Sequence, residues 1–430
     1  MTHGVTHIIG AGLAGLAAAV RLAGNRRQVI VHESASQAGG RCRSYHDAAF
    51  GGVIDNGNHL LLSGNSSALA LVKDIGAEDE LTGPATADFT FADLKSGERW
   101  AIDINNGRFP VWLFDSGRRV PGTRPQDYLE AAPLMWAGAD AIVTDTLKPE
   151  GALYKRLWEP LMVAALNTEP EKGSARLAGA IMRNTLAKGG SACRPIVAKN
   201  GLSSAFADPA IRFVEARGGR IQLSHRLRAI QREAGRIAAL DFGNGDLVVL
   251  NGGDDVILAV PPWTAADLLP EITTPAEFRS IVNAHFRIEP PADLPQIIGV
   301  VNATVEWIFS FHDRVSITIS SADRLVDRPR EQLAAEIWPE VAQITGLPME
   351  LPPWQIVKEK RATFAATPEQ DAKRPGAKTQ WNNLFLAGDW TQTGLPATIE
   401  GAIRSGERAA TLSTKGQRRG YRNHAASAGV

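Results

Sequence analysis

The 430-residue sequence has only two cysteines, Cys42 and Cys193, and lacks a charge excess of either sign. Two cysteines cannot build the multi-disulfide framework of small secreted domains, so we expect a reducing compartment. Basic and acidic residues number 46 each, which gives no electrostatic reason to expect nucleic acid as a partner. No uninterrupted apolar run reaches the ~18 residues of a transmembrane helix. We therefore expect a cytoplasmic protein, soluble or peripheral on the inner face of the membrane, with no metal site.

The beginning of the chain contains the pattern around which the rest is organised. Residues 6–9 are typical of a buried strand, residues 13–23 of a helix, and residues 28–32 of a second strand. The loop between the first strand and the helix is Gly10-Ala11-Gly12-Leu13-Ala14-Gly15. In dinucleotide-binding folds these glycines allow a tight turn, a close approach to a pyrophosphate, and close packing of helix on sheet.

Two further features extend this fingerprint. Glu33 ends the second strand about 20 residues beyond the glycines, where a carboxylate accepts hydrogen bonds from an adenosine ribose. Gly39-Gly40-Arg41 then suits a second pass of backbone and guanidinium along the same pyrophosphate. A secretory signal is the alternative for the apolar run 8–23. No Lys or Arg precedes that run, however, and its glycines would weaken a signal helix.

The length predicts two to three domains, and the composition changes near Asp88. Residues 88–93 and 99–102 alternate around Ser96-Gly97, which predicts a hairpin at the start of an inserted domain. Residues 154–166 form the most apolar helical segment of this insert. Its spacing fits either a buried core helix or one that faces lipid, and the core is the simpler interpretation.

The nucleotide domain resumes near Val197. The strands expected after it are 221–223, 227–230, 237–240, 247–250 and 255–260. A second insert follows, with strands expected at 285–288, 297–301, 305–311 and 315–319 and a helix at 331–344. The chain then returns to the cofactor through an apolar strand that ends in Gly388-Asp389. The helix 399–411 that follows could direct its positive end at a flavin ring.

Taken together, these motifs resemble the superfamily of flavin-dependent amine oxidases and carotenoid desaturases, up to about Leu412. The resemblance implies non-covalent FAD, because neither cysteine lies in the C-terminal segment where covalently flavinylated amine oxidases carry theirs. Only one dinucleotide fingerprint is present, so the reductant of the FAD must be external. The resemblance assigns cofactor binding to Gly10, Gly12, Leu13, Ala14, Gly15, Glu33, Gly39, Gly40, Arg41, Leu227, Ala259, Gly388, Asp389, Ala397, Thr398 and Ile399.

The finer pattern resembles the hydroxysqualene dehydroxylases, a squalene-associated branch of this superfamily in bacterial hopanoid biosynthesis. The segments responsible are 157–161, 165–168, 359–364 and 388–402. The branch implies reductive dehydroxylation of a C30 isoprenoid. Amine oxidases place a cage tyrosine where this chain has Leu395, which favours a hydrocarbon substrate. The alternatives are an isoprenoid desaturase, an amine or porphyrinogen oxidase, and a non-catalytic prenyl-binding protein.

The resemblance also implies an α/β architecture, with a discontinuous Rossmann-like FAD-binding domain and an inserted α+β substrate domain. We expect the FAD domain at 1–75, 196–265 and 381–412, the substrate domain at 76–195 and 266–380, and a disordered tail at 413–430. His59 follows an Asp-Asn-Gly bend and is the candidate proton donor; a structural hydrogen bond is the alternative. A C30 substrate favours loading from a membrane surface, with the helix 158–166 as a candidate tunnel wall or entrance.

Overall fold

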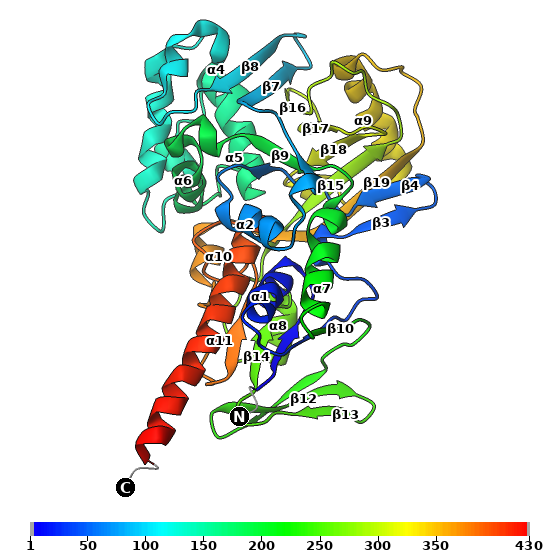
Figure 1. Ribbon diagram of the computed structural model, residues 1–430. Helices are drawn as coiled ribbons and strands as arrows, with labels where there is room; N and C mark the ends of the chain where they lie inside the picture. The colour runs from blue at the N-terminus through cyan, green and yellow to red at the C-terminus, as the bar shows by residue number, and fades with distance from the viewer. Residues whose placement is uncertain (1–3, 428–430) are drawn as a thin grey trace.

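Two β-sheets divide the molecule into a lower and an upper half (Figure 1), which we call the nucleotide half and the substrate half after the expectations above. The computed structural model describes residues 4–427, with the backbone alone for residues 415–427. The nucleotide half contains a parallel sheet of five strands in the order β10-β2-β1-β14-β20. Its strands are β1 Thr6–Ile9, β2 Val29–His32, β10 Arg220–Gln222, β14 Asp255–Leu258 and β20 Leu384–Leu386. Three distant parts of the chain build this sheet, so the predicted discontinuous α/β fold is confirmed.

Helices cover the parallel sheet, and α1 and α11, from opposite ends of the described chain, pack against each other there. Helix α1 (Leu13–Gly24) is buried on nearly every side, as its run of alanine and leucine predicts. Helix α11 (Ile399–Ser427) packs on α1 so closely that a Cβ at Gly406 would lie 2.0 Å from the carbonyl oxygen of Ala14. The other helices of this half are α2 Ser66–Asp74, α7 Asp208–Glu215, α8 Pro262–Leu268 and α10 Pro368–Ala372.

The substrate half contains a mixed sheet of seven strands in the order β19-β15-β18-β17-β16-β7-β8. All neighbours are antiparallel except β16 and β7, where the two inserts meet. The strands are β7 Ala87–Asp93, β8 Arg99–Ile104, β15 Phe278–Phe286, β16 Ile297–Val301, β17 Trp307–Ser310, β18 Val315–Ile319 and β19 Trp354–Phe364. The sequence did not predict β19. An edge strand tolerates the charged run 358–361 at its centre, and that run hides the strand pattern.

Helices and short sheets complete the two halves. Helix α9 (Arg330–Thr345) covers the seven-stranded sheet, and helix α6 (Ala175–Asn184) packs against the 3₁₀ helix η5 (Pro125–Trp136). Two further short helices are α3 Val143–Thr146 and α4 Gly151–Leu153. The short strands are β3 Ser44–Asp47, β4 Gly52–Asp55, β5 Leu61–Leu62, β6 Leu81–Thr82, β9 Pro195–Ala198, β11 Ala229–Glu233, β12 Arg236–Gly243 and β13 Asp246–Val249. The two- and three-residue strands lack an alternating pattern long enough to predict.

The apolar segment 154–166 is helical throughout. A π-helical turn (Tyr154–Trp158) leads into α5 (Glu159–Leu166), and Asn167 ends the helix in the left-handed conformation, at φ 48°. Most of its large apolar side chains are buried, among them Tyr154 and Trp158, while Leu161 and Val163 are partly buried. The segment is therefore a core helix, as the simpler interpretation predicted.

The C-terminal helix is longer than expected. It continues past Leu412 to Ser427, so the predicted disordered tail is helical over most of its length (Figure 1, red). Ser413 is buried, and its hydroxyl donates to Asp255 Oδ2 at 2.8 Å. Once a helix is nucleated, each added residue gains a hydrogen bond, so extension needs little apolar contact. The expected disorder of residues 428–430 lies outside the described residues. Within residues 4–427, no helix is both long and apolar enough to cross a membrane.

Candidate functional site

The turn between β1 and α1 offers space for a phosphate. A Cβ at Gly12 would meet no atom within 4 Å, whereas a Cβ at Gly15 would lie 1.9 Å from the carbonyl oxygen of Gly10. Gly12 is the N-cap of α1 and has a free face there, so the positive end of the helix points to open space. Gly10, at φ +107°, makes the turn itself. The three glycines thus divide into one with an open face, Gly12, and two that the backbone requires, Gly10 and Gly15.

The second glycine pair and Glu33 lie against this turn. Gly39 donates its N–H to the carbonyl oxygen of Ala11 at 2.8 Å, and a Cβ at Gly40 would lie 3.2 Å from Gly12 Cα. The Glu33 carboxylate accepts the N–H of Ala11 at 2.7 Å, which fixes it at the end of β2. The structure therefore brings the predicted phosphate and ribose groups to one edge of the sheet.

Arg41 and Asp389 form an ion pair of 2.7 Å although 348 residues separate them. The sequence predicted that each would contact the cofactor, and the structure shows that they also contact each other. The side chain of Arg41 is 42% exposed and that of Asp389 only 8%, so the arginine keeps a free face. Its other terminal nitrogen donates to the carbonyl of Ala362 on β19. This pair connects the N-terminal motif, the C-terminal motif and the substrate half.

A buried arginine that the sequence did not reveal supports the Gly388-Asp389 turn. Arg374 has no exposed side-chain surface and pairs with Asp371 at 2.8 Å. It also donates to the carbonyl oxygens of Asp389, at 3.1 Å, and Thr391. Arg374 lies in a polar, proline-containing segment that gives no sequence signal of burial. It holds the backbone of the C-terminal motif in place.

The loop that carries His59 joins the two halves. At its start, the buried Asp55 accepts a hydrogen bond from the N–H of Leu202 at 2.8 Å. At its end, the Asn58 amide donates to Thr318 on β18 at 3.2 Å, and Asn283 on β15 contacts the backbone of Asn58. Among the described residues, Asn58 Oδ1 is a buried acceptor with no hydrogen-bond partner. The sequence singled out His59 but missed Asn58 and Asn283.

His59 lies within the electrostatic influence of the Arg41–Asp389 pair. Burial and the neighbouring Arg41 lower the pKa of His59 to about 4, with Asp389 acting in the opposite direction. The imidazole is therefore neutral at pH 7. A neutral ring can donate one N–H hydrogen bond, but it has no extra proton to give as an imidazolium acid.

The remaining predicted residues lie near strand and helix ends. Ala259 follows β14, and its N–H donates to the carbonyl of Ile9 at 2.8 Å, beside the glycine turn. Leu13 and Ala14 form the first turn of α1, and Leu227 is buried just before β11. Ala397 and Thr398 precede α11, which Ile399 begins; Thr398 Oγ1 accepts the N–H of Gly401 at 3.0 Å.

Neither cysteine has the environment of a reactive thiolate. Cys42 and Cys193 are buried and free, and burial raises the pKa of each to about 12. A thiol that stays protonated is a weak nucleophile. Within residues 4–427, no group of three or more His, Cys, Asp or Glu side chains could hold a metal ion.

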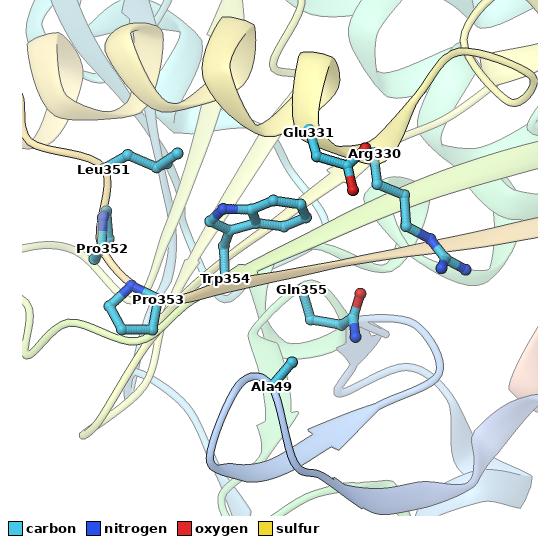
Figure 2. Close-up of a pocket in the computed structure, with 8 residues that line it drawn as sticks. All are labelled: Ala49, Arg330, Glu331, Leu351, Pro352, Pro353, Trp354 and Gln355. Carbon is cyan, nitrogen blue, oxygen red and sulfur yellow. The ribbon is translucent and has the colours of Figure 1, made fainter.

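A pocket of about 560 Å³ lies elsewhere, between the start of α9 and the start of β19 (Figure 2). None of the predicted cofactor or catalytic residues lines it. Figure 2 shows the Trp354 ring beneath α9, with Arg330 and Glu331 at the first turn of that helix and Ala49 on the loop opposite. This pocket is therefore separate from the candidate site.

The chain is similar to known proteins over nearly its whole length. It is 56% identical to hydroxysqualene dehydroxylase of Rhodopseudomonas palustris, across 94% of this chain and 97% of the relative. It is 25% identical to the probable zeta-carotene desaturase of Synechococcus elongatus, across 95% and 98%. Cyclohexylamine oxidase of Brevibacterium oxydans superposes with a TM-score of 0.69 at 15% identity, across 96% and 99%. Residues 13–412 match the flavin containing amine oxidoreductases, and the chain belongs to that family.

Proposed function

We propose that this protein reductively removes the hydroxyl group of hydroxysqualene to give squalene and water. The observation that supports this most directly is the 56% identity with the Rhodopseudomonas palustris hydroxysqualene dehydroxylase. In the reaction one C–O bond breaks and one C–H bond forms. The two electrons come from an external reductant by way of the flavin, and a proton leaves with the hydroxyl as water.

The cofactor is FAD, held without a covalent bond, and the geometry fits it. The open face of Gly12 at the positive end of α1 would take the pyrophosphate, and Glu33 the ribose. Arg41 and Asp389 would contact the cofactor with the groups that their ion pair leaves free. Reduced flavin, when bound, supplies hydride to the carbon that loses oxygen.

The protein must orient the hydroxyl and assist its departure. His59, neutral at pH 7, donates an N–H hydrogen bond to the departing oxygen in this proposal. Asn58, fixed to β18, sets the position of the loop that carries His59. Leu395 is buried where amine oxidases carry a cage tyrosine, so its apolar side chain suits a hydrocarbon better than an amine.

A desaturase is the main alternative. It would remove hydride from an isoprenoid and reduce oxidised FAD, which is the opposite direction of electron flow. The sequence identities argue against it, because the carotenoid desaturase named above is 25% identical to this chain and the dehydroxylase 56%. An amine oxidase would need the aromatic cage that Leu395 replaces in part.

We also propose that the protein works on one face of a membrane. A C30 hydrocarbon is nearly insoluble in water, so the protein would take its substrate from a bilayer and return the product to it. Within residues 4–427 no helix could span that bilayer, so contact would be peripheral.

An anaerobic single turnover tests the reaction. Purified protein carrying reduced FAD is mixed with hydroxysqualene in detergent in D₂O, so that the exchangeable N5 position of the flavin carries deuterium. We expect deuterium in the extracted squalene, together with oxidation of the flavin. If squalene does not form, and oxidised protein instead dehydrogenates a C30 hydrocarbon, the desaturase alternative replaces the proposal.

A further inference from the structure

Large apolar side chains are unusually exposed in one segment of the substrate half, at the upper left of Figure 1 in cyan. Single exposed apolar residues are ordinary, but five within the segment 109–136 are not. We call these five the apolar patch: Phe109 (71% exposed), Val111 (49%), Phe114 (69%), Leu129 (67%) and Trp136 (77%).

The segment that carries the apolar patch is firmly packed on its inner side. Trp112 is buried and lies edge-to-face against Tyr128, with ring centroids 5.3 Å apart. The Asn105 side chain accepts the N–H of Trp112 at 3.2 Å and donates to the carbonyl of Phe109 at 3.0 Å. The backbone therefore holds the exposed rings outward while their neighbours fill the core. Their exposure is a feature of the folded state and does not result from missing packing.

Cationic side chains border the apolar patch. Arg183 on α6 is exposed and donates to the carbonyl of Met135, next to Trp136. Arg108 and Lys188 are also exposed. They lie on segments in contact, because a Cβ at Gly189 would meet the carbonyl of Gly107 at 2.2 Å. Of the carboxylates nearby in the sequence, Asp127 is paired with Arg124, Asp115 accepts the N–H of Gly117, and Glu130 and Asp140 are exposed.

We propose that the apolar patch docks this protein on a bilayer that contains anionic phospholipid. Phe109, Phe114 and Trp136 enter the interface between headgroups and acyl chains, and the bordering cations contact phosphate groups. The proposal rests on the proposed function, which requires access to a membrane-dissolved substrate. It replaces the segment 158–166 as the membrane contact, because Trp158, Met162 and Leu166 are buried there.

A second copy of the chain is the competing occupant. A twofold interface would place the same patch on both sides, so a patch bordered by Arg108, Arg183 and Lys188 would face another bordered by the same three cations. Like charges across an interface oppose association, whereas an anionic surface attracts all three. The charge pattern therefore favours lipid over self-association.

Vesicle flotation of the FAD-loaded protein tests the proposal, with liposomes of phosphatidylcholine and phosphatidylglycerol. The test variant is Phe109→Ser/Phe114→Ser/Trp136→Ser. The matched control is Leu247→Ser/Val249→Ser, which removes exposed apolar residues from β13 at the opposite end of the molecule (Figure 1). We expect the bound fraction at fixed lipid to fall by roughly tenfold or more in the test variant and to stay unchanged in the control. Turnover of detergent-dispersed substrate should be normal in both.

Other outcomes overturn the proposal. Flotation of the test variant at the wild-type level would place the contact elsewhere on the surface. A wild-type protein that sediments as a dimer, with a monomeric test variant, would assign the patch to a second copy. Absence of flotation by the wild type would refute both the patch and membrane loading. Loss of detergent turnover in the wild type would instead refute the proposed reaction, so the two failures are distinguishable.

Discussion

The two sheets contribute to the candidate site by different means. At the edge of the parallel sheet, backbone groups dominate, namely the glycine turn and the first turn of α1. The Glu33 carboxylate is itself fixed there by a backbone group, the N–H of Ala11. At the seven-stranded sheet, side-chain amides and hydroxyls dominate, as in the contacts of Asn58 with Thr318 and Asn283. A backbone site needs glycine at fixed positions, whereas a side-chain site needs only a polar residue on the correct face. Substitutions should therefore affect the two sites differently.

The largest effect should come from the buried pair that supports the C-terminal motif. Arg374→Met removes one of the two arginines that pair with the buried Asp371, the other being Arg176, and frees the carbonyls of Asp389 and Thr391. We expect a loss of about 3–5 kcal/mol in the free energy of unfolding. Urea denaturation measures it, with Arg232→Met as control, since Arg232 and Glu271 form a more exposed pair worth about 0–1 kcal/mol. Equal losses in the two variants would contradict this account.

Substitutions at two glycines of the same turn should affect different properties, the free energy of unfolding at Gly15 and the FAD content at Gly12. Gly15→Ala places a methyl group 1.9 Å from a backbone oxygen, so we expect it to cost about 1–3 kcal/mol of stability. Gly12→Ala adds a methyl group in open space and should cost at most about 1 kcal/mol. It should nevertheless lower FAD content, measured by absorbance after gel filtration. Full flavin content in Gly12→Ala would remove Gly12 from the phosphate site.

The seven-stranded sheet should make the protein acid-sensitive. Burial, with a smaller contribution from Arg314, lowers the pKa of His285 to about 3. The unfolded chain binds a proton below pH 6.5 and the folded chain does not, so stability falls as the pH drops from 6.5 toward 3. Between pH 7.5 and 5.5 this histidine should account for about 1.4 kcal/mol. His285→Gln should reduce the pH-dependent loss by that amount, although its stability at pH 7.5 is lower.

The smallest effect on stability should come from His59. His59→Gln should leave unfolding and flavin content unchanged while it slows the single turnover, by on the order of tenfold if one hydrogen bond to the departing oxygen is lost. His46→Gln, at an exposed histidine on β3, is the control. Because the pKa of His59 is about 4, the His59 contribution should not change between pH 6 and 8. An unaltered rate would exclude His59 from the reaction.

The sequence predicted those helices, strands and turns whose local residue pattern is itself typical of the structure observed. The strand, glycine turn and helix of residues 6–24 were predicted within one residue, and so was the helix α9. The hairpin β7–β8 followed from alternation around Ser96-Gly97. In α9 and the hairpin, burial on one face leaves a periodic pattern in the sequence, whereas β1 and α1 are buried nearly all round and were predicted from apolar runs that flank a glycine motif.

What the sequence did not predict depends on contacts between distant residues. Nothing near Arg41 indicates a partner 348 residues away, and nothing near Arg374 indicates that it is fully buried. Asn283 lies in a strand whose sequence requires no amide, and its role arises only when the loop at Asn58 lies beside it. The length of α11 was underestimated because its last turns need no apolar face.

The pairing of the two chain ends has a consequence for biosynthesis. Arg41 leaves the ribosome 348 residues before Asp389, an interval of about 17–70 s at typical elongation rates of roughly 5–20 residues per second. During that interval β14 has no β20 beside it and α1 has no α11 to cover it. The face of α1 that packs on α11 thus stays uncovered until α11 emerges, and the Arg41–Asp389 pair can form only after residue 389 has been synthesised.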